Sequence, residues 1–310
     1  MTDKKKTILI ALGGNALIQK GQKGTAEEQF GNLKEPMETI AKLSRDYHVV
    51  ITHGNGPQVG NLLLQQESCD AVPKMPLDVV GAESQGQIGY MIESSLDTAL
   101  MKIGVEDSQP FVTLITYTVV DKDDPMFQNP TKPVGPFYSK EQADKLSYRM
   151  VETLHGYRRV VASPEPVTII NHREVKQLID LNFIVICCGG GGIPVVRDGK
   201  SFRGVDAVID KDLASSLLAS EIGADIFVVA TDEKGAYVDF GKPEQRLIEE
   251  MTVEEARKHI ADGQFPPGSM KPKVEAAVKF AEASGKKAVI TALGDIYEAV
   301  TGQTGTAVVR

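Results

Sequence analysis

The sequence contains no tryptophan and only three cysteines among its 310 residues. Cys187 and Cys188 are neighbours and Cys69 lies far from them, a spacing that fits neither a zinc site nor the disulfide framework of a small secreted domain. The five histidines form no metal-binding or catalytic-triad spacing either. We therefore expect a cytoplasmic protein with reduced thiols.

A basic surface and a long apolar segment are also missing. The formal net charge of -8 at pH 7 argues against nucleic acid or an acidic membrane as a partner, because polyanion binding needs a sustained excess of lysine and arginine. No stretch approaches the roughly 18 uninterrupted apolar residues that cross a bilayer. With 42% hydrophobic and 25% charged residues, the composition is that of a soluble globular protein. Any anion-binding site must therefore be local.

Short apolar runs rich in valine and isoleucine alternate with segments of helical spacing. Because these runs are continuously apolar, they predict strands that are covered on both faces. The pattern predicts an α/β fold, an open, mostly parallel sheet sandwiched by helices in three αβα layers. Strands are expected at 7–12, 49–52, 111–119, 167–170, 183–188, 226–230 and 288–291, and helices around 30–40, 213–222 and 274–281.

One segment breaks this alternation. Residues 121–166 are polar and rich in proline, and we expect them to form a small protruding subdomain outside the sheet. A fresh series of strands starts just after Gly223. We therefore expect two lobes, residues 1–223 and 224–310.

Three of the expected strands end in glycine clusters, Gly13-Gly14-Asn15, Gly54-Asn55-Gly56 and the run that contains Gly190 and Gly191. Glycine lets the backbone turn sharply and brings its N–H groups close to a ligand. A single cluster can simply close a loop, but open α/β sheets bind ligands outside the carboxyl ends of their strands. The three clusters together predict an anion-binding site at that edge.

The familiar nucleotide motifs are absent. There is no G-x-x-x-x-G-K-[ST] loop, so the chain is not a P-loop enzyme. The turn from Gly54 to Gly60 resembles a dinucleotide fingerprint with one extra residue, which leaves a nicotinamide oxidoreductase as an alternative. That alternative explains only one of the three glycine clusters.

Lysines stand at the expected starts of two helices, Lys211 before the segment 213–222 and Lys273 before the segment 274–281. A cation at a helix N-terminus opposes the helix dipole by about 0.3 to 1 kcal/mol, unless an anion lies beside it. A lysine that extends into solvent is the simpler interpretation for either one alone. Two such helices favour a shared anion, with Asp212 holding the lysines by charge.

Several longer runs carry a resemblance. They are Gly13-Gly14-Asn15-Ala16-Leu17, THGNGPQVGN from Thr52, NPTKP from Asn129, IDKD from Ile209 and PKVEAA from Pro272. These runs resemble the carbamate kinases, a branch of the amino acid kinase family, and they extend from the first expected strand to the last expected helix.

The resemblance implies a homodimer in which ATP and carbamate react reversibly to give ADP and carbamoyl phosphate, usually toward ATP in arginine fermentation. It implies Mg²⁺ bound with the nucleotide, whose protein ligands the sequence does not identify. In the catalytic site, Lys211 and Lys273 would stabilise the transferring group and Asp212 would organise them. The substrate-binding residues would be Gly13, Gly14, Asn15, Gly54, Asn55, Gly56, Gly190 and Gly191. The nucleotide would lie along Ala230, Thr231, Asp232, Tyr237, Phe240, Met270 and Lys271.

One departure from the wider family bears on the substrate. Most amino acid kinases carry a lysine two residues before the first glycine pair, where this chain has Ala11. Carbamate kinases resemble one another in supplying that cation from the protruding subdomain, and Lys132 is the match. Without the surrounding motif, a loop lysine between two prolines would simply be solvated. Another amino acid kinase activity, or a non-catalytic ligand-binding regulator on the same fold, stays as an alternative.

Overall fold

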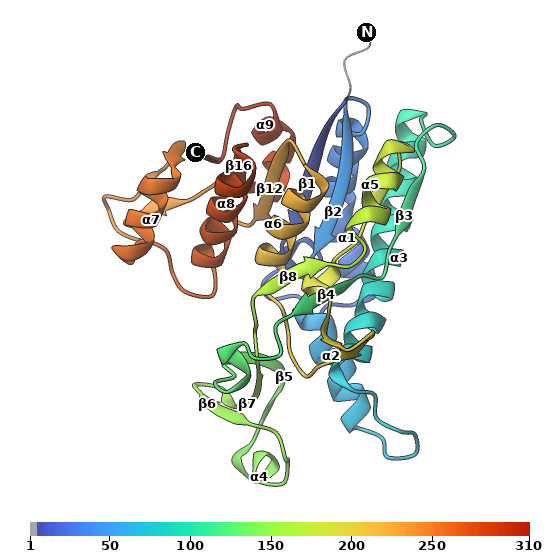
Figure 1. Ribbon diagram of the computed structural model, residues 1–310, viewed down its shortest axis with the longest axis vertical. Helices are drawn as coiled ribbons and strands as arrows, with labels where there is room; N and C mark the ends of the chain where they lie inside the picture. The colour runs from blue at the N-terminus through green and yellow to red at the C-terminus, as the bar shows by residue number, and fades with distance from the viewer. Residues whose placement is uncertain (1–4) are drawn as a thin grey trace.

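An eight-stranded sheet forms the centre of the computed structural model, which describes residues 5–310 (Figure 1). In spatial order its strands are β15 (Glu250–Thr252), β17 (Thr306–Val309), β16 (Ala288–Ala292), β12 (Ile226–Thr231), β1 (Lys6–Leu12), β2 (Tyr47–His53), β9 (Ile184–Ile186) and β3 (Phe111–Thr113). The strands from β16 to β3 are parallel, whereas β17 runs antiparallel to β16. The predicted open, mostly parallel sheet is confirmed.

Helices cover both faces of this sheet, as Figure 1 shows. Strand β1 explains why: Ile8 and Ile10 pack into one apolar core and Leu9 and Ala11 into the other, and all four are fully buried. One core is closed by α1 (Ala26–Leu43), α3 (Leu77–Ile103) and α9 (Ile296–Val300), and the other by α5 (His172–Asp180), α6 (Lys211–Ile222), α7 (Val253–Ala261) and α8 (Met270–Ser284). The three-layer architecture is confirmed.

A second sheet corrects one predicted strand. Residues 111–119 do not form a single strand, since β3 ends at Thr113 and β4 (Tyr117–Val120) belongs to a four-stranded sheet with β11 (Ser201–Gly204), β10 (Ile193–Asp198) and β8 (Pro166–Ile169). The backbone leaves the main sheet because Thr116 N–H donates instead to the Gln85 side chain of α3 over 2.9 Å. The strand predicted at 167–170 exists as β8, but in this second sheet.

A small three-stranded sheet projects from the main body, at the bottom of Figure 1. It consists of β5 (Lys132–Tyr138), β7 (Gly156–Val161) and β6 (Met150–Thr153), with α4 (Lys140–Ala143), and all of it falls within the range 121–166. The Tyr138 hydroxyl donates to Glu67, at the end of α2 (Gly56–Glu67), over 2.6 Å. We refer to this unit as the protruding subdomain.

The division into two lobes stays a prediction. Gly223 ends α6 in a left-handed conformation with φ of 76°, and the chain then enters β12, which pairs directly with β1. The sheet is therefore continuous across the expected boundary. Within residues 5–310, no helix combines the length and the apolarity that a membrane span requires.

Candidate active site

The first two glycine clusters pack against each other at the carboxyl ends of β1 and β2. The Gly54 N–H donates to the carbonyl oxygen of Leu12 over 3.1 Å, and a Cβ atom on Gly54 would lie 3.4 Å from the backbone nitrogen of Gly14. The Gly13 N–H donates to the carbonyl oxygen of Ala230 at the end of β12. Because these strands are parallel neighbours, their turns meet at the edge where open α/β sheets bind ligands.

The third cluster reaches the same place from β9. Gly190 has φ of 64°, and a Cβ atom there would overlap the side-chain amide of Asn55. A Cβ atom on Gly189 would likewise overlap the imidazole ring of His53. Only glycine fits at these two positions, so the third turn lies directly against the second.

Two lysines share one carboxylate beside these turns. Lys211 opens α6 and Lys273 lies in the first turn of α8, and their Nζ atoms lie 2.7 Å and 3.0 Å from the two carboxylate oxygens of Asp212. The Asp212 side chain is 5% exposed, and the lysine side chains are 13% and 15% exposed. We call these three residues the Lys–Asp–Lys cluster. The cluster carries two positive charges and one negative charge, and its side chains are largely shielded from solvent.

The electrostatics of the cluster favour an anion. Burial opposes ionisation of Asp212, but the two neighbouring lysines outweigh burial and lower the pKa of this carboxyl group. Burial lowers the pKa of Lys211, and its attraction to Asp212 offsets this only in part. A buried charge without a full counter-charge is costly, so an anionic ligand would be bound favourably here.

Asp210 connects this cluster to the protruding subdomain. One of its oxygens accepts from the backbone N–H of Asp212 over 2.9 Å, which caps the start of α6. The other lies 3.2 Å from Nζ of Lys132 on β5. The structure thus brings Lys132 from the subdomain to the helix start that carries Lys211.

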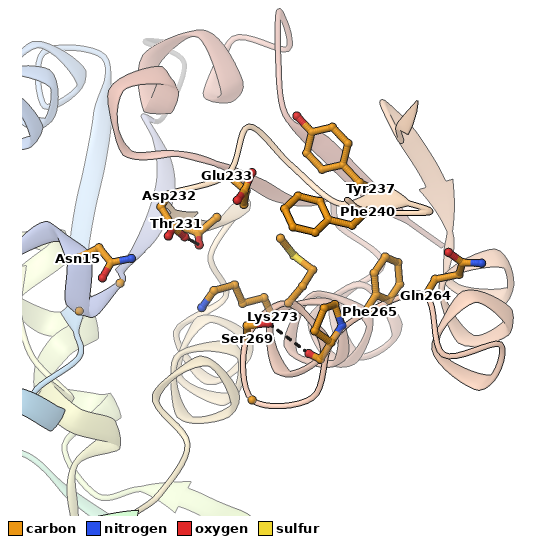
Figure 2. Close-up of a pocket in the computed structure, with 15 residues that line it drawn as sticks. Asn15, Thr231, Asp232, Glu233, Tyr237, Phe240, Gln264, Phe265, Ser269 and Lys273 are labelled. Atoms are coloured by element: carbon orange, nitrogen blue, oxygen red, sulfur yellow. Dashed lines mark hydrogen bonds between the residues drawn. The ribbon is translucent and has the colours of Figure 1, made fainter. Parts of the chain in front are cut away.

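The first glycine turn and Lys273 also line a cavity of about 330 Å³. Figure 2 shows the rings of Tyr237, Phe240 and Phe265 gathered at one end, while the Lys273 amine extends toward Asn15 at the other. Tyr237 lies on β13 (Tyr237–Val238), which pairs with β14 (Arg246–Leu247). The cavity therefore has an apolar, aromatic end and a cationic, glycine-lined end.

Most of the predicted nucleotide residues line this cavity, namely Thr231, Asp232, Tyr237, Phe240 and Met270. Two do not. Ala230 is fully buried in the sheet, where its carbonyl oxygen serves Gly13, and Lys271 points away to an ion pair of 3.7 Å with Glu275.

Sequence reasoning missed one wall of the cavity. The missed lining residues are Glu233, Gln264, Phe265, Pro266, Gly268 and Ser269. All but Glu233 belong to the loop before α8, in which the Ser269 hydroxyl donates to the Pro266 carbonyl over 3.4 Å (Figure 2). The sequence did contain a signal for this wall. Two prolines and a glycine, residues 266–268, directly precede a helix start that carries lysines against the helix dipole.

A smaller cavity of about 100 Å³ lies between the second and third glycine turns and the protruding subdomain. The predicted residues Asn55, Gly56, Gly190 and Lys132 line it. Gly191 does not, because it packs against the Ile209 backbone and its carbonyl accepts from the Thr118 hydroxyl over 2.7 Å. The remaining lining residues are Val59, Leu77, Gly81, Pro133, Val134, Arg158, Gly192, Pro194, Ala207 and Val208.

His53 is a packing residue. It is 1% exposed, and its Nδ1–H donates to the carbonyl oxygen of Gly54 over 3.0 Å. Burial lowers the pKa of His53 to about 4, and the charge of Lys211 adds to that effect. The imidazole is therefore neutral at pH 7.

Residues 5–310 contain no group of three or more Asp, Glu, His or Cys side chains that could hold a metal ion by themselves. Asp232 and Glu233 both line the larger cavity. An ion bound there would need further oxygen ligands from a phosphate group or from water.

Comparisons with known proteins agree with this geometry. Residues 6–292 match the model of the amino acid kinase family. The carbamate kinase of Thermococcus kodakarensis is 50% identical, over 98% of this chain and 99% of the relative, and that of Clostridium perfringens is 46% identical, over 98% and 99%. The structure of carbamate kinase from Giardia lamblia bound to AMP-PNP has a TM-score of 0.93 and 43% identity, covering 98% of each chain.

Proposed function

The chain belongs to the amino acid kinase family, and from this premise we propose that it is a carbamate kinase, which transfers a phosphoryl group reversibly between ATP with carbamate and ADP with carbamoyl phosphate. Near-complete coverage of relatives with that name supports the proposal. Where arginine breakdown supplies carbamoyl phosphate, the reaction would run toward ATP.

The observation that carries the proposal is the position of the Lys–Asp–Lys cluster between the residues that line the two cavities. Lys273 lines the larger cavity, and Gly54, at the start of the turn that lines the smaller one, lies against Gly14 and the Lys211 side chain. A transferring phosphoryl group carries negative charge on its equatorial oxygens, and fixed cations that face it stabilise the transition state. The site thus has a donor side, an acceptor side and cations between them.

The larger cavity suits a nucleotide. Its aromatic end, with Tyr237, Phe240 and Phe265, offers faces on which adenine can pack. Its other end presents the backbone of Gly13 and Gly14 together with Lys273 to the phosphates. The nucleotide would therefore lie with its terminal phosphate toward the cluster.

The transfer needs no general base. Carbamate is already an anion at neutral pH, so one of its oxygens can attack the γ-phosphorus while the bond to the ADP oxygen breaks and that oxygen keeps the electron pair. The chain's residues align the reactants and neutralise charge. His53, buried and neutral, takes no proton in this scheme.

Mg²⁺ would neutralise and orient the β- and γ-phosphates when the nucleotide is bound. The residues fit this group only as partial ligands, because Asp232 and Glu233 are the carboxylates of the cavity lining and no larger acidic cluster occurs within residues 5–310. Phosphate oxygens and water would supply most of the coordination.

A homodimer is part of the same proposal. Val79, Tyr90 and Met101 of α3 are 38%, 64% and 57% exposed. Their regular spacing of 11 residues, close to three helical turns, places them on one face of that helix. The short edge strand β3 also leaves one side of the main sheet unpaired within the described chain. A helix face that exposes three large apolar side chains beside an open sheet edge is suited to contact with a second copy.

Ala11 argues against other acceptors of the family. It is fully buried in the core below the first glycine turn, so no cation reaches the acceptor side from β1. The acceptor cavity of about 100 Å³ is also small and walled by valine and leucine. Both features favour a compact acceptor such as carbamate over an N-acylated amino acid or UMP.

The proposal is tested with a panel of acceptors in the ADP-forming direction. Purified protein with ATP and Mg²⁺ is given carbamate, acetate, N-acetylglutamate or UMP in parallel, and ADP release is quantified by chromatography. We expect turnover with carbamate to exceed that with the other acceptors by orders of magnitude. Equal or faster turnover with another acceptor would refute the assignment, and no turnover with any of them would favour a non-catalytic regulator.

A further inference from the structure

Arg158 is a cation of the acceptor cavity that the catalytic account above leaves unused. It lies on β7 of the protruding subdomain, where its Nε–H donates to the Gly135 carbonyl oxygen over 3.1 Å. Its guanidinium carbon lies 5.2 Å from the centre of the Phe137 ring. Both partners belong to β5, so the subdomain itself holds the guanidinium in place.

Arg158 has no counter-charge in the described part of the chain. Its neighbour Arg159 pairs with Asp206 over 2.6 Å, but no carboxylate among residues 5–310 pairs with Arg158. Burial alone lowers the pKa of Arg158, and no opposing charge offsets it. A half-buried cation of this kind is unfavourable unless a ligand supplies the negative charge.

The surroundings of Arg158 point to where that ligand lies. Arg158 and Lys132 line the same small cavity, together with the Asn55 side chain and the backbone of Gly190. Lys132 already has Asp210 at 3.2 Å, whereas Arg158 keeps its charge available. The opposite walls of the cavity are apolar, which strengthens any charge interaction inside it.

We propose that Arg158 is a second acceptor-site cation, which binds the carboxylate of carbamate and, in the reverse direction, the carbonyl oxygen of carbamoyl phosphate. This rests on the proposed carbamate kinase function. The planar guanidinium of arginine presents parallel donors that match a carboxylate, which the point charge of lysine does not. Nε is already used by Gly135, so the terminal nitrogens serve the ligand.

This role differs from that of the Lys–Asp–Lys cluster. The cluster faces the transferring phosphoryl group, whereas Arg158 binds the acceptor, chiefly through the oxygen that does not bond to phosphorus. Loss of Arg158 should therefore raise KM for the acceptor more than it lowers kcat. Binding of ADP, in the other cavity, should stay unchanged.

The experiment compares Arg158→Met and Arg158→Lys with the wild type in ATP formation from ADP and carbamoyl phosphate. For Arg158→Met we expect KM for carbamoyl phosphate to rise about 10- to 100-fold, as for loss of a hydrogen bond to a charged group. KM for ADP should change less than about twofold. Arg158→Lys should recover only part of the loss, because lysine keeps the charge without the fork.

Two control variants separate binding from packing. Arg197→Met removes an arginine stacked on Phe202 at the same 5.2 Å, on an exposed hairpin, and should leave both KM values unchanged. Phe137→Leu removes the ring beside Arg158 but keeps the charge, and should affect KM for carbamoyl phosphate much less than Arg158→Met. Adding guanidinium ions to Arg158→Ala should lower its KM for carbamoyl phosphate.

Several results would overturn the inference. An unchanged KM for carbamoyl phosphate in a folded Arg158→Met protein, or an equal rise in Phe137→Leu, would assign Arg158 to subdomain packing alone. If Arg158→Met fails to fold, an Arg158→Lys protein with wild-type KM decides against the role in the same way. A wild-type enzyme that makes no ATP from carbamoyl phosphate would instead refute the proposed function.

Discussion

The substitution Asp212→Asn tests how the structure holds two buried lysine side chains close together. Asp212→Asn keeps the shape of the side chain but removes the only carboxylate of residues 5–310 that lies within 3.0 Å of both Lys211 and Lys273. Breaking a buried ion pair by removing one partner typically costs about 3 to 5 kcal/mol, because the remaining charge stays buried and unpaired. We expect a loss of that size in the free energy of unfolding at pH 8.

The assay for this variant is urea unfolding followed by circular dichroism, with and without inorganic phosphate. Phosphate should stabilise Asp212→Asn more than the wild type, because the variant site has a larger surplus of positive charge. At a hundredfold excess over its Kd, a ligand that binds only the folded state adds about 2.7 kcal/mol.

A matched control removes a carboxylate from an ion pair near the surface. Asp225 lies 2.8 Å from Nζ of Lys286, and both side chains are 36% exposed. Asp225→Asn should cost less than about 1 kcal/mol, since exposed pairs are largely screened. A loss in Asp212→Asn no larger than in this control, or no extra stabilisation by phosphate, would refute the account of the cluster.

Lys211→Ala and Lys273→Ala should each lower kcat about 100- to 1,000-fold while circular dichroism shows a retained fold, because their charge acts mainly in the transition state; near-normal turnover in both would remove them from the catalytic role. Lys132→Ala should raise KM for carbamoyl phosphate about tenfold with a smaller effect on kcat, and an unchanged KM would exclude it from the acceptor site. In His53→Gln, the free energy of unfolding should fall less between pH 7 and 4 than it does in the wild type. Since burial lowers the pKa of folded His53 from 6.5 to about 4, the unfolded chain takes up the proton first, and the wild type loses stability as the pH falls through this range. That loss is about 3 kcal/mol in total, and urea midpoints between pH 7 and 4 that fall equally in both proteins would contradict it.

The sheet and its ligand-binding edge could be predicted because each follows from a local pattern. Residues 7–12 are apolar at every position, and in the structure alternate side chains of β1 do pack into two separate cores. Gly13 and Gly54 follow two such strands, and parallel pairing is enough to bring them together. The lysines at the starts of α6 and α8 were visible as exceptions to the helix-dipole rule, and they meet at Asp212.

Features that depend on contacts between distant segments were not visible in the sequence. The break at Thr116 arises because the Gln85 side chain of α3 replaces a strand as hydrogen-bond partner. The cavity wall formed by Gln264 and Phe265 depends on how the loop before α8 folds back toward β13. Lys271 stands next to Met270, yet it points away from the cavity, since successive helical residues face different directions.

Arg158 illustrates the same limit. From the sequence it is one of two adjacent arginines in a polar segment, with nothing to distinguish it from Arg159. In the structure Arg159 pairs with Asp206, whereas Arg158 lines the acceptor cavity without a counter-charge. Adjacent residues of a strand point to opposite sides, and only the strand pairing decides which one faces the cavity.

The central claim is that this site passes a phosphoryl group between carbamoyl phosphate and ADP. It is tested most directly by a coupled assay that records ATP formed from ADP and carbamoyl phosphate in the presence of Mg²⁺, with acetyl phosphate as the parallel substrate. The account predicts rapid ATP formation from carbamoyl phosphate and far slower formation from acetyl phosphate. No ATP from carbamoyl phosphate, with ready formation from the other acyl phosphate, would contradict it.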